Sequence, residues 1–223
     1  MSGTDDIKER RVAWALLIFC PAMMLVILAY VSAGNASGLD AGHPMEYLQM
    51  TCILWAMIST AIPLLRLLRF VSLPIWFILL VQGDMFLYVI SLCQGFYLNL
   101  SWWGDLTHII ASVIVTSFVF IAICLIQSRS PEHVTFGSKY GITLILFLVA
   151  LSFGGIWEIM EGFTDVLTGT SYMVYGATDT LGDLVADFVG VSLMSITALV
   201  ILSKQGAERV ASKVRLGRSM IPF

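Results

Sequence analysis

The sequence predicts an all-α, polytopic membrane protein with six transmembrane helices. Hydrophobic residues make up 58% of the 223 residues, and charged residues only 12%. Soluble domains carry about 25% charged residues, and so short a chain cannot bury that much apolar surface in a water-soluble core. Six segments are also apolar over the roughly 20 residues that a membrane-spanning helix needs.

We expect these spans to form a single transmembrane domain over residues 1–223. Backbone groups in lipid must be hydrogen-bonded within their own segment, which favours helices over open strands. The first span follows a basic start, but it is longer than the apolar core of a signal peptide, about 7–15 residues. We therefore interpret it as an uncleaved span. The expected spans are residues 12–33, 47–68, 71–93, 105–127, 140–160 and 180–203.

The basic residues predict the orientation. All twelve lysines and arginines fall in the N-terminus, the 2–3 turn, the 4–5 loop or the C-terminus, and the other three loops contain none. The positive-inside rule then places both termini in the cytoplasm of a multi-pass cell-membrane protein. The four cysteines stand alone in apolar runs, so we interpret them as packing residues and not as metal or redox pairs.

Acids inside the expected spans are the informative residues, because each is costly in lipid unless it is paired, protonated or hydrated. Asp105 and His108 are three residues apart and share a helix face, as do Glu158 and Glu161. The sixth span opens with acids at every fourth position, which form a stripe along the helix. The further acids are Asp84 in the third span and Asp179, Asp183 and Asp187 in the sixth.

Except for Asp84, these groups lie in the half of each span opposite the basic loops, so no lysine or arginine can neutralise them. Crowded carboxylates with one imidazole must hold either protons or a cation. Oxygen donors with one imidazole suit a divalent ion such as Mn, Fe, Zn, Mg or Ca, without choosing among them. The expected metal ligands are Asp105, His108, Glu158, Glu161, Asp183 and Asp187, with Asp84 and Asp179 as further candidates.

Simpler roles stay open for several of these residues. Asp105 and Asp179 stand where each would cap the N-terminus of its helix. Glu161 is also compatible with a solvated loop charge, and His108 with a packed histidine. Glycines at 154, 155, 182 and 190 predict close approach of the fifth and sixth spans near the acids.

The segments Trp157-Glu158-Ile-Met-Glu161 and Asp179-Thr180-Leu-Gly-Asp183 resemble the YjdF-like inner-membrane family, which is distantly similar to VanZ-like proteins. Asp105 and His108 match the earlier Asp…His element of that family, at a spacing shorter by one residue. The resemblance covers the second half of the chain. It implies a membrane protein with a weak link to cell-envelope lipids, and it implies no particular activity, cofactor or partner.

Three functions remain open at this level. The first is a metal-dependent enzyme acting on a lipid or lipid-linked substrate, with a metal-bound water as nucleophile and a carboxylate as base. The second is a cation- or proton-coupled transporter that uses Asp84 and Asp187 along its path. The third is a non-catalytic subunit with a structural cation site. The expected partner is the lipid bilayer, with no nucleic acid; the sequence does not indicate an oligomeric state.

Overall fold

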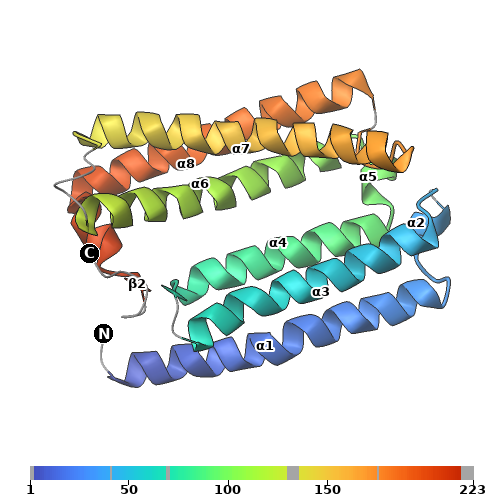
Figure 1. Ribbon diagram of the computed structural model, residues 1–223, viewed down its shortest axis with the longest axis horizontal. Coiled ribbons are helices and arrows are strands. Elements are labelled where there is room, and N and C mark those ends of the chain that lie inside the picture. Colours follow the sequence, from blue (N-terminus) through green and yellow to red (C-terminus); the bar gives the residue numbers. More distant parts are fainter. Residues whose placement is uncertain (1–2, 41, 69–70, 130–135, 175, 217–223) are drawn as a thin grey trace. The chain divides into compact units, whose positions relative to one another are not determined.

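The computed structural model describes residues 3–40, 42–68, 71–129, 136–174 and 176–216 (Figure 1). Within these residues, six helices are long and apolar enough to cross a membrane, as the sequence predicts. They are α1 (Gly3–Ser32), α3 (Met45–Leu67), α4 (Ile75–Cys93), α6 (Trp103–Arg129), α7 (Lys139–Thr168) and α8 (Ala177–Ala211). The short elements are α2 (Ser37–Asp40), α5 (Phe96–Asn99), β1 (Val71–Ser72) and β2 (Arg215–Leu216).

The helices group into two compact units, which are described separately. The first unit contains α1 to α5, with β1 and β2, and the second contains α6, α7 and α8. The expectation of a single domain over the whole chain stays a prediction.

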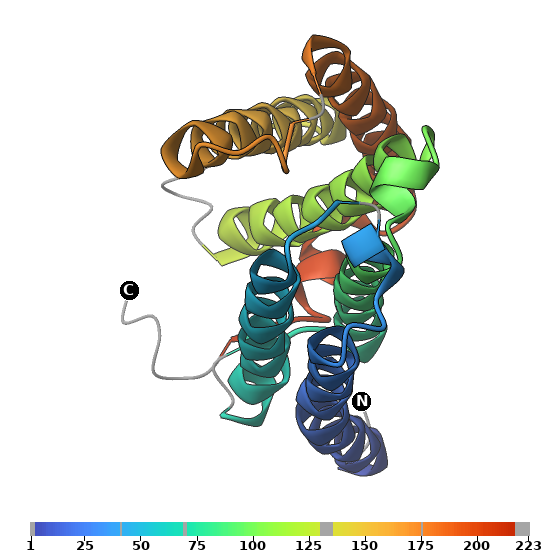
Figure 2. The same ribbon diagram turned by 90° about the vertical axis from the view of Figure 1, so that its right-hand side faces the viewer.

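In the first unit, α1, α3 and α4 lie side by side (Figure 2) around a core that includes Met24, Leu48 and Val89. Arg66, buried near the end of α3, pairs with Glu9 of α1 and donates to the carbonyl of Leu73. The side chain of Gln82 in α4 donates to the Ser59 carbonyl of α3 at 2.7 Å. These polar contacts join α3 to α1 at one end and to α4 near the middle.

The third span begins later than the sequence predicts. We expected it from residue 71, but α4 begins at Ile75, after Pro74 at its N-cap. Proline disfavours a helical conformation in the residue before it, and Val71 and Ser72 instead pair antiparallel with Leu216 and Arg215. The two-residue strands β1 and β2 are a small departure from an all-α fold.

In the second unit, α8 packs more extensively on α6 than on α7. Its core includes Cys124, Leu146 and Ala198, one residue from each helix. A Cβ on Gly190 of α8 would lie 2.6 Å from the carbonyl oxygen of Ile109 and 2.8 Å from Cβ of Ser112, so glycine permits the close approach of α6. Gly190 therefore faces α6, whereas the sequence predicted that it would serve contact between the fifth and sixth spans.

The direction of each helix in this unit follows from its contacts. Asp105 of α6 lies against Gly182 of α8, and Ser112 further along α6 lies against Gly190, so α6 and α8 run parallel. α7 runs antiparallel to α8, because Lys139 at its start donates to Ser203 at 3.1 Å. The first turns of α6 and α8 therefore lie at the same end of the unit as the last turns of α7.

The fifth span extends beyond its expected end at residue 160. α7 continues to Thr168 and ends at Gly169, which adopts a left-handed conformation with φ of 65°. Glycine accepts this conformation without the steric penalty of a Cβ, and it commonly terminates helices. Glu161 therefore lies inside a helix and is buried, which excludes the alternative of a solvated loop charge.

Candidate functional site

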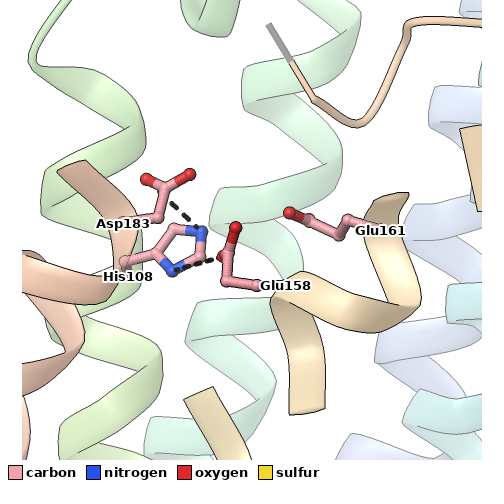
Figure 3. Close-up of side chains that lie close together, drawn as sticks. All are labelled: His108, Glu158, Glu161 and Asp183. Atoms are coloured by element: carbon pink, nitrogen blue, oxygen red, sulfur yellow. Dashed lines mark ion pairs between the residues drawn. The ribbon is translucent and has the colours of Figure 1, made fainter. Parts of the chain in front are cut away.

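Four ionisable side chains converge in the second unit, and each of its three helices contributes at least one. They are His108 of α6, Glu158 and Glu161 of α7, and Asp183 of α8 (Figure 3). One potential ligand atom from each residue lies within 4.8 Å of those from the other three. We call these four residues the acid–histidine cluster. All four are among the metal ligands that the sequence predicts.

Helical periodicity explains why α7 contributes two residues. Glu158 and Glu161 are three positions apart, so they project from one face of the helix, and both are buried. Trp157 donates from Nε1 to Oε1 of Glu161 at 2.8 Å, which fixes that carboxylate from the side. In Figure 3 the Glu161 side chain points toward Glu158, so the two carboxylates face a common space.

Glu158 is the most demanding member of the cluster. Its residue is only 7% exposed, and neither carboxylate oxygen has a partner within normal hydrogen-bond geometry among the described residues, the Thr180 hydroxyl interacting more weakly. Its nearest ionic partner is His108, whose Nδ1 lies 4.0 Å from Oε1. A buried carboxylate without compensating hydrogen bonds is strongly unfavourable. The carboxylate must therefore either be protonated or have a cation beside it.

Both ring nitrogens of His108 face carboxylates. Nδ1 lies 3.3 Å from Oδ1 of Asp187, and Nε2 lies 3.6 Å from Oδ1 of Asp183. The second separation is longer than a normal N–H···O hydrogen bond. A bare nitrogen lone pair opposite a carboxylate is repulsive, so Nε2 either carries a proton or shares a cation with Asp183.

Asp187 lies beside the cluster and is held by α6. Its Oδ1 accepts a hydrogen bond from Oγ of Ser112 at 2.6 Å and contacts His108. Its Oδ2 is buried and has no hydrogen-bond partner among the described residues. Ser112 was not singled out from the sequence, although it is four residues after His108 and therefore on the same helix face.

The other predicted candidates are placed differently. Asp105, in the first turn of α6, is exposed and is not one of the four converging residues. A Cβ on Gly182 would lie 3.2 Å from its Oδ1, so Asp105 lies against the start of α8. Asp179 lies in the first turn of α8, where Gly176 and not Asp179 is the N-cap residue. Asp84 lies in α4, in the first unit, and its role stays a prediction.

Asp165 is a buried acid that the sequence did not reveal as important. One turn after Glu161 on α7, it accepts hydrogen bonds from the backbone amides of the loop that leads to α8. The donors are Thr170 Oγ1 at 2.8 Å, the amides of Tyr172 and Met173 at 3.0 Å, and that of Val174 at 2.9 Å. These bonds satisfy the carboxylate, so Asp165 fixes the loop and is not a ligand candidate.

The dimensions of the cluster fit one divalent cation. Zn–ligand distances are about 2.0–2.2 Å, and Ca–oxygen distances are about 2.3–2.6 Å. Ligands on opposite sides of an ion are therefore separated by roughly 4.0 to 5.2 Å. The separations of up to 4.8 Å fall within this range with little movement. The described basic residues of the unit, which include Arg129, Lys139 and Lys204, lie at the other ends of the helices.

Comparison with known proteins supports the membrane assignment. The family described as "Predicted membrane protein (DUF2238)" matches residues 20–204. A Thermotoga maritima protein described as "Uncharacterized protein" is 30% identical over 118 residues, which cover 52% of this chain and 58% of the relative. No solved structure matches the chain.

These matches confirm the expected membership of a YjdF-like membrane family, and they leave the more distant VanZ-like similarity as a prediction. The family match covers four spans completely and more than half of the first and of the sixth, including every residue of the acid–histidine cluster. The chain therefore belongs to the DUF2238 family of predicted membrane proteins.

Proposed function

We propose that this multi-pass membrane protein binds one divalent metal ion in the acid–histidine cluster and uses it in chemistry on the headgroup of a lipid or lipid-linked substrate. The observation that carries the proposal is Glu158, a buried carboxylate that points into the cluster with neither oxygen in a hydrogen bond of normal geometry among the described residues. With three carboxylates and one imidazole, a divalent ion would balance most of the charge that the site otherwise leaves unpaired.

The depth of the cluster favours a headgroup as substrate. Measured along the helices at 1.5 Å per residue, His108 lies about 31 Å from Arg129, Glu158 about 28 Å from Lys139, and Asp183 about 31 Å from Lys204. The hydrocarbon core of a bilayer is about 30 Å thick. If these basic residues lie at one membrane interface, the cluster lies at the opposite interface, where water and lipid headgroups meet.

Access from the lipid is consistent with this placement. On the outer turns of α7 and α8, apolar side chains next to the ligands are exposed, among them Ile159 at 71%, Phe163 at 56% and Leu181 at 63%. In a bilayer these surfaces contact acyl chains. An amphiphile could therefore keep its chains in the bilayer while its headgroup reaches the cluster.

A metal ion in such a site would act as a Lewis acid and lower the pKa of a bound water. The residues of the chain would hold the ion, orient it through His108, and accept a proton at a carboxylate of the cluster. The described lysines and arginines of the second unit lie at the other ends of its helices, so within this unit a phosphate or carboxylate in the substrate would have to be recognised through the ion.

Transport is a less well supported function for the same site. Secondary transporters bind their cargo near the bilayer midplane, and a path would need polar groups that continue toward the basic end. Residues 109–129 of α6, 139–157 of α7 and 188–203 of α8 contain no acid or histidine. Between the cluster and the basic residues at the other ends of α6, α7 and α8, no acid lies deeper than Asp187.

The test is elemental analysis of detergent-purified protein with and without the cluster carboxylates. We expect about one divalent ion per wild-type chain, and less than a tenth of that in Glu158→Gln and Asp183→Asn. Glu208→Gln is the matched control, because Glu208 is an exposed acid at the far end of α8. Equal metal content in all four proteins would rule out a metal site here.

A second measurement separates catalysis from a purely structural ion. Metal-loaded protein is reconstituted into vesicles of a bacterial lipid extract, and the lipids are followed by mass spectrometry. Conversion of a headgroup by the wild type, but not by Glu158→Gln, supports the enzyme. Full metal occupancy with unchanged lipids, together with a loss of thermal stability on metal removal, would favour the structural role.

A further inference from the structure

Outside the four converging residues, Asp187 and Ser112 form a chain of contacts that leads to His108. Oγ of Ser112 donates to Oδ1 of Asp187 at 2.6 Å, and the same oxygen lies 3.3 Å from Nδ1 of His108. Asp187 and Ser112 are 3% and 7% exposed, so water competes little for these contacts. The opposite ring nitrogen, Nε2, faces Asp183 of the cluster.

From this geometry we infer that Asp187 and Ser112 are positioning residues for His108, which hold Nδ1 protonated and turn Nε2 toward the bound cation. This inference rests on the proposed metal site. A carboxylate that accepts from one ring nitrogen fixes the tautomer, because the proton stays on that nitrogen and leaves the other lone pair free for a metal. Asp187 thus acts through His108, whereas the sequence predicted it as a direct ligand.

The backbone around Asp187 supports a fixed orientation. Gly154 of α7 lies so close that a Cβ there would collide with the carboxylate of Asp187, its Cγ being 2.9 Å from the ideal Cβ position. The carboxylate is therefore confined between α6 and α7. With little room to rotate, it keeps Oδ1 on Ser112 and His108. This confinement holds the imidazole in one orientation before any ion binds.

Ser112 acts on His108 only through Asp187, and its role can be tested separately. Its hydroxyl donates to the oxygen that faces His108, so losing it removes one of the contacts that hold this oxygen toward the ring, without removing the charge of Asp187. Ser117 is the matched control, because it is a buried serine on the same helix that donates only to its own backbone, at Val113, at 2.7 Å. A difference between Ser112→Ala and Ser117→Ala therefore reports the contact with Asp187.

The experiment measures the Zn²⁺ affinity of the full-length protein in lipid nanodiscs by competition with a chelating dye. Removing a partner that orients a metal-binding histidine typically weakens metal binding 10- to 100-fold. We expect this range for Asp187→Asn, and roughly 3- to 10-fold for Ser112→Ala, smaller because the charge remains. Glu208→Gln and Ser117→Ala should stay within about twofold of the wild type, since neither contacts the cluster.

A spectroscopic readout separates positioning from a general loss of stability. Nitrogen NMR of protein labelled with ¹⁵N-histidine distinguishes the ring nitrogen that carries the proton from the one that binds Zn²⁺. The wild type should show Zn²⁺ on Nε2 and the proton on Nδ1 of His108, assigned by comparison with His108→Gln. Asp187→Asn should show a mixture of tautomers in the absence of zinc.

The possible failures are distinguishable. If the wild type binds no divalent ion, Zn²⁺ included, the proposed function fails and the positioning role falls with it. If the wild type binds Zn²⁺ but Asp187→Asn matches Glu208→Gln, or if Zn²⁺ binds Nδ1, the positioning role alone is overturned. Should Asp187→Asn not fold, Ser112→Ala decides the matter, and an affinity equal to that of Ser117→Ala would overturn the inference.

Discussion

The backbone of Gly154 in α7 lies directly against the side-chain carboxylate of Asp187 in α8. The ideal position of a Cβ on Gly154 is only 2.9 Å from Cγ of Asp187 and 3.2 Å from its Cβ. The neighbouring Gly155 has nothing within 4 Å of its own Cβ position. Two adjacent glycines on one helix therefore have opposite surroundings, and only the first is required by packing.

Alanine at these two positions should have effects of opposite sign. Gly154→Ala inserts a methyl group into an occupied space, and such overpacking destabilises a protein by about 1–3 kcal/mol. Gly155→Ala adds a methyl group to open space and should stabilise the helix by up to about 1 kcal/mol, because glycine is the poorer helix former. Unfolding in mixed micelles measures both, and equal effects would contradict the close contact.

Metal binding should raise the stability of the wild type. At a free Zn²⁺ concentration one hundred times its Kd, the free energy of unfolding should increase by about 2.7 kcal/mol, and EDTA should reverse the gain. Glu158→Gln should lose this response. Without metal, however, the variant should be more stable than the wild type, because a neutral amide is less unfavourable than an unpaired buried carboxylate. Thermal unfolding with and without Zn²⁺ tests both expectations, and Glu208→Gln serves as the control.

Asp165 should be important for stability and not for metal content. Asp165→Ala removes the acceptor of three backbone amides and one hydroxyl in the loop between α7 and α8. Loss of a buried partner costs about 1–3 kcal/mol, so we expect a loss of at least about 2 kcal/mol. Thr164→Ala, an exposed neighbour whose hydroxyl bonds only to its own helix, should change stability by less than about 0.5 kcal/mol.

Because His43 is buried, the stability of the first unit should depend on pH. This histidine lies in the segment between α2 and α3, outside the spans, and burial lowers its pKa from the usual 6.5. The unfolded chain then binds a proton more readily than the folded chain. Stability should be unaffected by this group above pH 6.5 and should fall as the pH decreases below it, by at most about 1.4 kcal/mol per unit. His43→Phe should remove that part of the slope in unfolding titrations.

The orientation of the protein can be checked by cysteine labelling. Single cysteines are introduced at Ser101 and Ser212, which are both exposed and lie on opposite sides of the membrane if the six spans alternate. The native cysteines are all buried and should react little. In intact cells, an impermeant maleimide should label Ser101→Cys, and Ser212→Cys only after permeabilisation. The reverse pattern would contradict the positive-inside assignment.

The sequence was sufficient to predict the spans, because composition and length alone determine which segments cross a bilayer. It was less informative about where each helix ends. The limits of α4 and α7 depend on Pro74 and on Gly169, and on the pairing of β1 with β2, a contact between segments far apart in the chain. Hydropathy does not carry that information, so Asp165 was not recognised as part of a helix.

The sequence likewise predicted only part of the candidate site. Spacing along one helix correctly placed Glu158 and Glu161 on a common face. Which of the acids from different helices converge depends on how far each helix is rotated about its axis, and packing at residues such as Gly154 and Gly190 determines that rotation. Hence Asp105 was expected among the ligands, although it lies exposed beside the start of α8. Ser112 was overlooked because serine is common in membrane helices.

The contribution of all three helices to one cluster has a mechanical consequence. An ion held by His108, Glu158, Glu161 and Asp183 would tie α6, α7 and α8 together near one membrane surface. Pulling the chain from its C-terminus would then have to break a coordination bond before α8 could leave the bilayer. The ion would thus act as a removable crosslink, and the three helices would be extracted by force in a single step when it is bound and in separate steps when it is not.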